Sequence, residues 1–305
     1  MVARELANAG KTVKVIDRRK HIAGNCYDYW KDGVRVHKYG PHIFHTNDKK
    51  VFDWLSQYTE WVEYKHKVKA YYKGQYLTLP PNKQTKEILG EHLFDVIYKP
   101  YTSKMWGVNP NSLDSSILQR VKTTDDDNEL YFPNDKYQYM PKHGYHTMVQ
   151  NILNHPNIEV ELGCSFDRSM EEEYDHIYNS MSIDEYYNYI YGKLPYRSIT
   201  FHQKHESKLQ PTSVVNFTDN KPYTRMTRWE MFPSHGSGDI VTIEEPHECI
   251  NDDRYYPIQD KDKVNHTLYK RYKQIPNAKV TFIGRCGLYA YLDMDKAVSI
   301  ALKTI

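Results

Sequence analysis

The stretch TVKVIDRR, residues 12–19, decides the fold of this 305-residue chain. Its apolar residues alternate as in a buried β-strand, and residues 3–9 before it have a helical pattern that stops at Gly10, the position of a C-capping glycine. A helix therefore leads into a parallel strand. The strand ends at Asp17, and an acidic residue at the tip of the second strand of a dinucleotide-binding fold hydrogen-bonds the adenosine ribose. The stretch predicts an α/β, Rossmann-like nucleotide-binding domain.

The segment upstream of this strand is shorter than that fold requires. A first strand and a GxGxxG turn precede the helix in a dinucleotide-binding fold, yet Gly10 is the only glycine before Gly24 and lies at the other end of the helix. We therefore expect an incomplete Rossmann-like domain. We also expect Met1 to be an internal methionine, and cofactor binding to need the preceding segment.

The rest of the chain predicts two further parts. An alternating, hairpin-like segment at 62–79 is ended by two prolines, and a helical pattern with short loops runs from 85 to 120. Short β-rich segments between 196 and 244 predict an antiparallel layer, and a buried strand at 279–284 precedes a helix at 293–302. The predicted boundaries are 1–60 plus 137–190 plus 276–305 for a discontinuous α/β domain, 82–136 for a small helical lobe, and 61–81 plus 191–275 for an antiparallel β-sheet substrate domain.

The composition excludes several classes of protein. The 41 basic and 39 acidic residues are spread along the chain and leave a net charge of +2, without a basic block that would bind nucleic acid. No stretch approaches the roughly 18 apolar residues of a membrane span, and the N-terminus lacks a signal peptide core. The four cysteines form no CxxC pair, which favours free thiols over disulfides or zinc. We expect a cytoplasmic protein.

Two histidines flank an apolar pair in the loop that follows residue 37. His42 and His45 could ligate a metal at this spacing, but no third ligand is indicated nearby and Pro41 favours a loop. We therefore predict no metal site and place both histidines beside a cofactor ring. The acidic run at 125–127 is interpreted as a solvated loop.

Seven segments carry a resemblance to a known family. They are DRRKHIAGN (17–25), HKYGPHIFHTND (37–48), YTSKMWG (101–107), YFPNDKYQYMPKHGY (131–145), NFTDNKPYTR (216–225), YYP (255–257) and GRCGLYAYLDM (284–294). In order and approximate spacing they resemble the bacterial UDP-galactopyranose mutases over nearly the whole chain. A single one of these motifs would carry little weight.

The resemblance implies a flavin-dependent isomerase that interconverts UDP-galactopyranose and UDP-galactofuranose for surface glycan synthesis. In that family the cofactor is reduced FAD, whose N5 attacks the anomeric carbon and displaces UDP. The sugar opens through an iminium adduct and recloses as a five-membered ring, and UDP returns, which is covalent catalysis by a cofactor. The partner implied is a UDP-hexose, and a homodimer is left open.

The resemblance also assigns roles to residues of this chain. Two arginines match the clamp on the diphosphate, where guanidinium groups bind phosphate oxygens bidentately; they are Arg120 and Arg225, and with His42 and His45 they form the catalytic set. The implied substrate-binding residues are Tyr101, Trp106, Tyr131, Asn216, Tyr256 and Tyr291. The implied FAD-binding residues are Asp17, Arg18, Arg19, Asn25, Gly284, Arg285, Asp293 and Met294.

The match departs from the family pattern in places, and alternatives stay open. The connection 81–91 is short where the family usually has additional helices, NSMS at 179–182 replaces a turn richer in glycine and proline, and residues 122–124 lack a second arginine. One alternative is another UDP-hexose as substrate. The others are an FAD-dependent oxidoreductase of the amine-oxidase type and a non-catalytic remnant; the paired arginines and the tyrosines favour the mutase.

Overall fold

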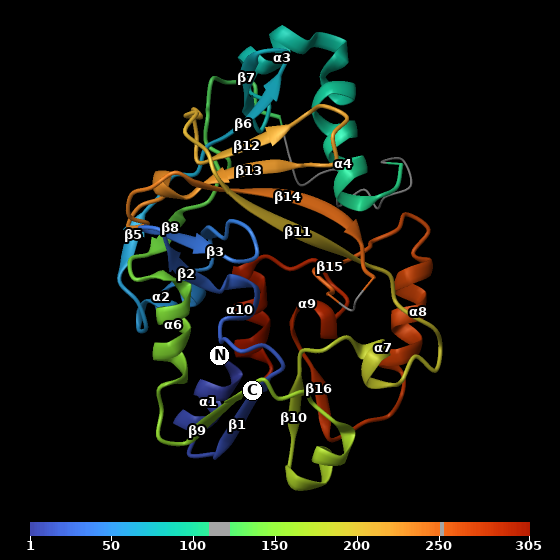
Figure 1. Ribbon diagram of the computed structural model, residues 1–305. Coiled ribbons are helices and arrows are strands. Elements are labelled where there is room, and N and C mark those ends of the chain that lie inside the picture. The colour runs from blue at the N-terminus through green and yellow to red at the C-terminus, as the bar shows by residue number, and fades with distance from the viewer. Residues whose placement is uncertain (110–122, 251–252) are drawn as a thin grey trace.

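The computed structural model describes residues 1–109, 123–250 and 253–305, and Figure 1 shows their arrangement. The helices are α1 (Val2–Asn8), α2 (Lys49–Ser56), α3 (Lys83–Leu89), α4 (Lys99–Trp106), α6 (Gly144–Leu153), α7 (Ile183–Tyr186), α8 (Val264–Lys273), α9 (Gly284–Gly287) and α10 (Met294–Lys303).

The strands are β1 (Val13–Asp17), β2 (Asp28–Lys31), β3 (Val34–His37), β4 (Phe44–Thr46), β5 (Trp61–Glu63), β6 (Val68–Tyr72), β7 (Gln75–Leu79), β8 (Tyr137–Pro141), β9 (Ile158–Leu162), β10 (Ile177–Asn179), β11 (Tyr196–His205), β12 (Val214–Phe217), β13 (Arg225–Arg228), β14 (Ile240–Glu248), β15 (Tyr256–Pro257) and β16 (Val280–Phe282).

A seven-stranded sheet crosses the upper half of the molecule in the order β15-β11-β14-β13-β12-β6-β7 (Figure 1). All of its pairs are antiparallel except β12 with β6. The turn between β6 and β7 is formed by Lys73 and Gly74, both with positive φ, as a two-residue hairpin turn requires. The antiparallel layer and this turn agree with the prediction from sequence.

The parallel strands of the nucleotide-binding half form two pairs, within the incomplete Rossmann-like domain that the sequence predicts. β1 pairs in parallel with β9, and β10 pairs in parallel with β16, but these remain two separate two-stranded sheets among the described residues. The apolar residues of β1 are consequently only half-buried, because each strand of the pair has one hydrogen-bonded neighbour. The helix before β1 and the parallel direction of the strands are as predicted.

The helical lobe stands at the top of Figure 1, beside β6 and β7. Asn82 caps α3 by accepting a hydrogen bond from Thr85 N–H (3.0 Å), and a π-helical turn at Phe94–Tyr98 leads into α4. Gly107 ends α4 with φ of +67°. The segment 61–63 was predicted to start the hairpin of the antiparallel domain, but β5 pairs with β8 in a separate sheet with β4, because the chain turns between Glu63 and Val68.

The largest core lies between the seven-stranded sheet and the elements β3, β4, α2, α6 and α10. A second core, rich in tyrosine, packs around α7 and α8, and a third surrounds Trp106 and Tyr256. Within the described residues, no helix is long and apolar enough to cross a membrane.

Candidate active site

Four aromatic residues predicted to bind substrate come together where α4 meets the seven-stranded sheet. The Trp106 ring lies 5.0 Å from the ring of Tyr256 and 5.8 Å from that of Tyr291, measured between centroids, and Tyr256 and Tyr291 are 5.7 Å apart. Tyr101, one turn earlier on α4, packs against the same cluster. Burial raises the pKa of the Tyr101 hydroxyl, so it stays a neutral hydrogen-bonding group.

Arg225 lies beside this aromatic cluster and is paired with a buried carboxylate. Its Nε donates to Glu244 Oε1 at 2.7 Å across the β13–β14 pair. Burial alone would lower the pKa of Arg225, but the Glu244 charge raises it, and the guanidinium remains a cation. Burial raises the pKa of Glu244. Glu244 Oε2 is buried without a hydrogen-bond partner among the described residues, so the ion pair has an unused acceptor.

His42 lies in the loop after β3, close to two guanidinium groups. Its Nδ1 is 2.9 Å from the carbonyl of Gly40, which can only accept, so Nδ1 carries the proton and Nε2 has the lone pair. Burial, together with the charges of Arg285 and Arg225, lowers the pKa of His42 to about 4. The imidazole is therefore neutral at pH 7. Gly40 has φ of +82°, and a Cβ there would lie 2.8 Å from Glu244 Oε1, so glycine is required for this close packing.

His45 occupies a different environment from His42. Its Nδ1 is 2.6 Å from Asp135 Oδ2, and its ring is stacked on Phe132 at 3.6 Å between centroids. The neighbouring Tyr131 donates its backbone N–H to the carbonyl of His66 (2.8 Å), and Tyr131 lies close enough to Tyr101 to raise the pKa of the Tyr101 hydroxyl. The 131–135 segment thus borders the aromatic cluster.

Asn216 is the remaining predicted substrate contact that the structure describes. It lies on β12 directly opposite Arg225 of β13 and is 8% exposed. Lys104 of α4 donates to three carbonyls at the end of β12 and in the loop that follows it, those of Phe217 (2.9 Å), Asp219 (3.0 Å) and Tyr223 (2.8 Å). One ammonium therefore joins the helix of the aromatic cluster to the hairpin of Arg225.

The predicted adenosine-binding residues gather at the carboxyl end of β1. Asp17 Oδ1 accepts from the backbone N–H of Arg19 (2.8 Å), and the Arg19 guanidinium donates to Asn25 Oδ1 (2.9 Å). The charges of Arg18 and Arg19 both act on Cys286 of α9, which places them near the C-terminal segment. The four residues predicted from sequence are thus close to one another.

The C-terminal segment links this end to the aromatic cluster. The Arg285 guanidinium donates to the carbonyls of Tyr255 (3.2 Å) and Leu292 (2.7 Å), and its carbon lies 4.9 Å from the centre of the Tyr291 ring. Asp293 is the N-cap of α10, and Met294 Sδ is 3.4 Å from Cys26 Sγ. Arg285 therefore contacts the aromatic side of the site, and its charge also acts on the Cys26 thiol next to Asn25.

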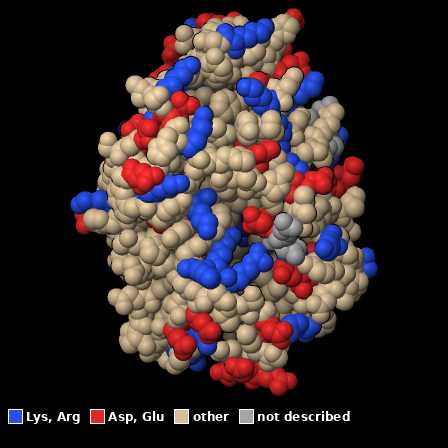
Figure 2. Space-filling model, in the orientation of Figure 1, with Lys and Arg blue, Asp and Glu red and all other residues tan. Residues whose placement is uncertain are grey.

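These residues fit a dinucleotide cofactor. Asp17 ends β1, and Asn179 ends β10 with a buried Nδ2 that has no partner among the described residues. Gly284, with φ of +70°, follows β16, so the carboxyl ends of parallel strands present the donors and acceptors that dinucleotides bind. The face in Figure 2 shows a gathering of Lys and Arg side chains near its middle, over the region of α9 and α10, as phosphate binding requires.

Several functional candidates were missed from the sequence, and one prediction lies outside the described residues. Arg120 falls within 110–122, which the structure does not describe. Glu244 was missed because no local motif marks it. Arg197 was also missed: this buried guanidinium donates to the carbonyls of Met105 and Lys104 (both 3.1 Å), next to Trp106. Arg197 lies in a strand two residues after Pro195, and no motif around it marks it as a residue of the site.

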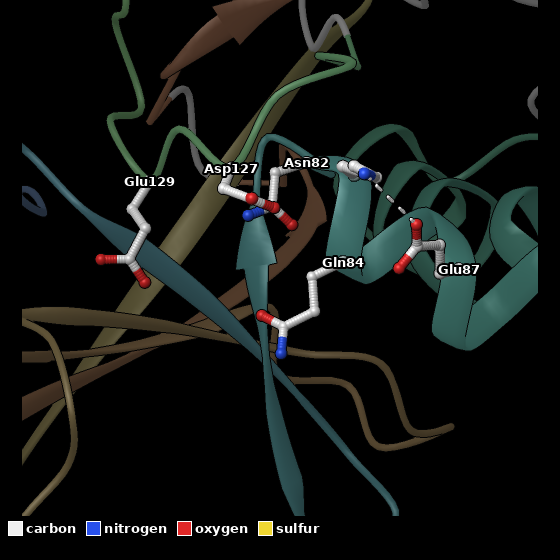
Figure 3. Close-up of a pocket in the computed structure, with 6 residues that line it drawn as sticks. Asn82, Gln84, Glu87, Asp127 and Glu129 are labelled. Atoms are coloured by element: carbon white, nitrogen blue, oxygen red, sulfur yellow. Dashed lines mark ion pairs between the residues drawn. The ribbon is translucent and has the colours of Figure 1, made fainter.

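A surface cavity of about 410 Å³ lies apart from these residues, at the start of α3 (Figure 3). It is lined by Asn82, Lys83, Gln84, Glu87, Asp127 and Glu129. Three carboxylates make it unsuited to a diphosphate, and it includes no predicted site residue. Within the ranges that the structure describes, no group of three or more His, Cys, Asp or Glu side chains could hold a metal ion.

Comparisons with known proteins show what this chain is similar to. The family model described as UDP-galactopyranose mutase matches residues 96–291, and that of an NAD(P)-binding Rossmann-like domain matches residues 1–58. A probable UDP-galactopyranose mutase of Klebsiella pneumoniae is 36% identical over 349 aligned positions, which cover 100% of this chain and 90% of the relative. A dTDP-fucopyranose mutase of Escherichia coli is 33% identical, covering 99% and 93%.

The fold is shared with solved structures as well. A crystal structure of reduced UDP-galactopyranose mutase superposes with a TM-score of 0.70 at 13% identity, over 99% of this chain and 90% of that chain. The Rossmann-like α/β class predicted from the sequence is thereby confirmed. The mutase family model spans more than half of the chain, and the probable UDP-galactopyranose mutase of Klebsiella pneumoniae is 36% identical with 100% of this chain aligned, so the chain belongs to the UDP-galactopyranose mutase family.

Proposed function

We propose that the protein interconverts UDP-galactopyranose and UDP-galactofuranose with reduced FAD as its cofactor. The observation that carries this proposal is the joining of a buried Arg225–Glu244 ion pair, a cluster of neutral tyrosines and the Arg285 contact within one site. The substrate of an amine oxidase carries no diphosphate, so such an enzyme would need no cations for its substrate. Membership of the mutase family supports the same reaction.

The substrate's diphosphate would bind at Arg225 and the neighbouring hydroxyl groups. Glu244 accepts from Nε of Arg225, which leaves the terminal guanidinium nitrogens available for phosphate oxygens within the part of the chain that the structure describes. Tyr101 and Tyr291 would donate hydrogen bonds to the phosphates, and burial raises the pKa of Tyr101, so its hydroxyl adds no negative charge. The Tyr256 hydroxyl donates to the carbonyl of Met105 and would have to leave this acceptor to reach a phosphate. Trp106 offers an indole face for the uracil ring. Arg120 is proposed as the second cation of the clamp.

The cofactor would extend from β1 to the aromatic cluster. Asp17, Arg18, Arg19 and Asn25 would hold its adenosine end, and the segment from Gly284 to Met294 its flavin end. When bound, the reduced flavin supplies the nucleophile for the anomeric carbon of the sugar. His42, neutral with Nε2 as an acceptor, can receive a hydrogen bond beside the flavin ring without competing with Arg285 for negative charge. We propose His45 as a support for this loop through its bond to Asp135.

Replacement of Arg225 tests the clamp. Arg225→Ala removes the charge, and Arg225→Lys keeps a cation opposite Glu244 but loses the bidentate fork, so we expect both to lower turnover of UDP-galactofuranose by roughly 10²-fold or more. Bound flavin should be retained, as measured by its absorbance. Arg168→Ala is the matched control, because Arg168 is an exposed arginine paired with Glu171. Near-normal rates for Arg225→Lys would contradict the bidentate role.

The nucleotide and hexose specificity needs a separate test. A relative at 33% identity is named a dTDP-fucopyranose mutase, so dTDP-fucose should be compared with UDP-galactose at equal concentration. UDP-N-acetylgalactosamine, the other alternative substrate, should be included in the same comparison. We expect UDP-galactose to give the highest kcat/KM. We further propose that the enzyme acts in the cytoplasm and forms a homodimer. Light scattering after gel filtration would measure the molar mass of the assembly.

A further inference from the structure

Two histidines form a buried pair in the largest core, next to the candidate site. His37, the last residue of β3, and His235, from the loop before β14, approach with 3.0 Å between their Nε2 atoms. Both side chains are 1% exposed or less and are enclosed by the rings of Trp229, Phe232 and Tyr145. A nitrogen pair at this distance is a hydrogen bond only if one nitrogen carries a proton and the other does not.

The outer contacts of the pair determine which nitrogen carries the proton. The backbone N–H of His42 donates to His37 Nδ1 (3.1 Å), so this nitrogen has the lone pair and His37 is protonated at Nε2. His235 Nδ1 is 2.8 Å from the carbonyl of Pro233, which only accepts, so His235 is protonated at Nδ1 and accepts at Nε2. All three hydrogen bonds are then satisfied, and both rings are neutral.

The surroundings disfavour any other protonation state. The charged or titratable groups that act on His37 among the described residues are Arg35 of the same strand, His42 and His235, and each opposes a positive charge. Burial is the largest cause of the lowered pKa of His235, and together with the charge of Arg35 it brings that pKa to about 4. A second proton on the pair would set two N–H groups against each other at 3.0 Å.

The end of this hydrogen-bond chain is the backbone of the loop that carries His42. Other contacts also hold the loop: Tyr255 donates to the carbonyl of Tyr39 (2.6 Å), Lys38 N–H donates to the carbonyl of Tyr27 (2.9 Å), and Gly40 packs against Glu244. The contact with His37 is the bond that fixes the backbone N–H of His42 itself. The ring of His42 then presents Nε2, because Nδ1 is bonded to Gly40.

We propose that His37, held by His235 as the Nε2–H tautomer, is a positioning residue that sets the orientation of His42 in the active site. It touches neither substrate nor cofactor and acts through the backbone of His42. The effect on turnover rests on the mutase function proposed above, whereas the hydrogen-bond chain is independent of it.

The tautomers are tested on the unaltered holoenzyme. Long-range proton–nitrogen spectra of the nitrogen-15-labelled protein at pH 7 should show His37 protonated only at Nε2 and His235 only at Nδ1. Spectra of single variants assign the signals. A His37 ring protonated at Nδ1, or at both nitrogens, would overturn the inference whatever the activity of the protein.

Two amide variants separate positioning from folding. The Oδ1 of His37→Asn replaces the Nδ1 acceptor, whereas the amide of His37→Gln reaches His235 but supplies no acceptor for His42 N–H. We expect the amide proton of His42 to shift in His37→Gln and to stay close to its original position in His37→Asn. Turnover should change in parallel with the amide shift. We expect kcat to be about tenfold lower in His37→Gln, which corresponds to the loss of one buried hydrogen bond, and to be largely restored in His37→Asn.

The control is His202→Gln, because His202 is an exposed histidine of β11 paired with Glu245. It should change neither the His42 amide signal nor kcat. Equal shifts of the His42 amide in both His37 variants would overturn the positioning role. If the unaltered holoenzyme does not turn over UDP-galactofuranose, the proposed function fails, and the amide shifts alone decide this inference.

Discussion

At the scale of single residues, the candidate site keeps most of its titratable groups neutral around a few permanent cations. Burial lowers the pKa of His42 and raises those of Tyr101 and Tyr256, while Arg225 stays charged beside Glu244. Neutral hydrogen-bonding groups around a cation suit a ligand that brings its own negative charge. A diphosphate meets that description.

The buried histidines predict how stability depends on pH. The native pKa is lowered to about 4 for His42 and His235 and to about 3 for His66, below the ordinary 6.5, so unfolding takes up protons under mildly acidic conditions. Their stabilisation is complete above pH 6.5 and is lost as pH falls toward 4. Each contributes a slope of about 1.4 kcal/mol per pH unit in that window.

Urea denaturation between pH 7.5 and 5 measures this slope. His66→Gln should reduce it, and His202→Gln, on the exposed face of β11, should leave it unchanged. A free energy of unfolding that stays constant from pH 7.5 to 5 would show that these histidines are not buried in the neutral form.

The sequence predicts the contact partners of single residues less completely than it predicts helices and strands, and Glu244 shows why. Arg225 stands in a recognisable motif, but Glu244 is 19 positions away and meets it only through the register of β13 and β14. His37 and His235 are separated by 198 positions, and nothing local marks them as a pair. Partners across a sheet depend on pairing that no single stretch encodes.

At the scale of elements, the attachment of α4 organises the site. Lys104 in its last turn donates to three carbonyls, and its side chain is 13% exposed. Arg197 donates to two carbonyls at the C-terminal end of the same helix, where cations are favoured. The orientation of Trp106 and Tyr101 therefore depends on these two cations.

Removal of the Lys104 ammonium tests this attachment. Lys104→Met keeps the apolar stem but leaves three carbonyls without their donor, so we expect the free energy of unfolding to fall by about 2–4 kcal/mol. Lys99→Met, on the same helix, loses only an exposed ion pair with Asp95 and should change it by less than about 1 kcal/mol. Equal urea midpoints for the two variants would mean that the attachment contributes no stability.

Elements with a strong local signal were predicted correctly. The β6–β7 turn has its Lys-Gly pair, the strand 12–16 is β1, and the helix 293–302 is α10. The pairing of β5 with β8 depends on tertiary contacts and was not predicted. Periodicity identifies a strand, but it does not identify the neighbour of that strand.

At the scale of the whole molecule, the candidate site lies where separate parts of the chain meet. The carboxyl ends of β1, β10 and β16 would form the dinucleotide side, and α4 with β13 and β14 would form the substrate side, with the C-terminal segment at Arg285 between them (Figure 1). This arrangement would place a flavin ring against a nucleotide sugar, as the proposed isomerisation requires.

The most direct test is turnover by the protein with flavin bound. After reconstitution with FAD, with bound flavin verified by absorbance, the protein is reduced with dithionite and incubated with UDP-galactofuranose, and the products are separated by anion exchange. We expect conversion to UDP-galactopyranose that depends on reduction. Flavin-loaded, reduced protein that leaves UDP-galactofuranose unchanged, or oxidised protein that consumes amines instead, would contradict the proposed function.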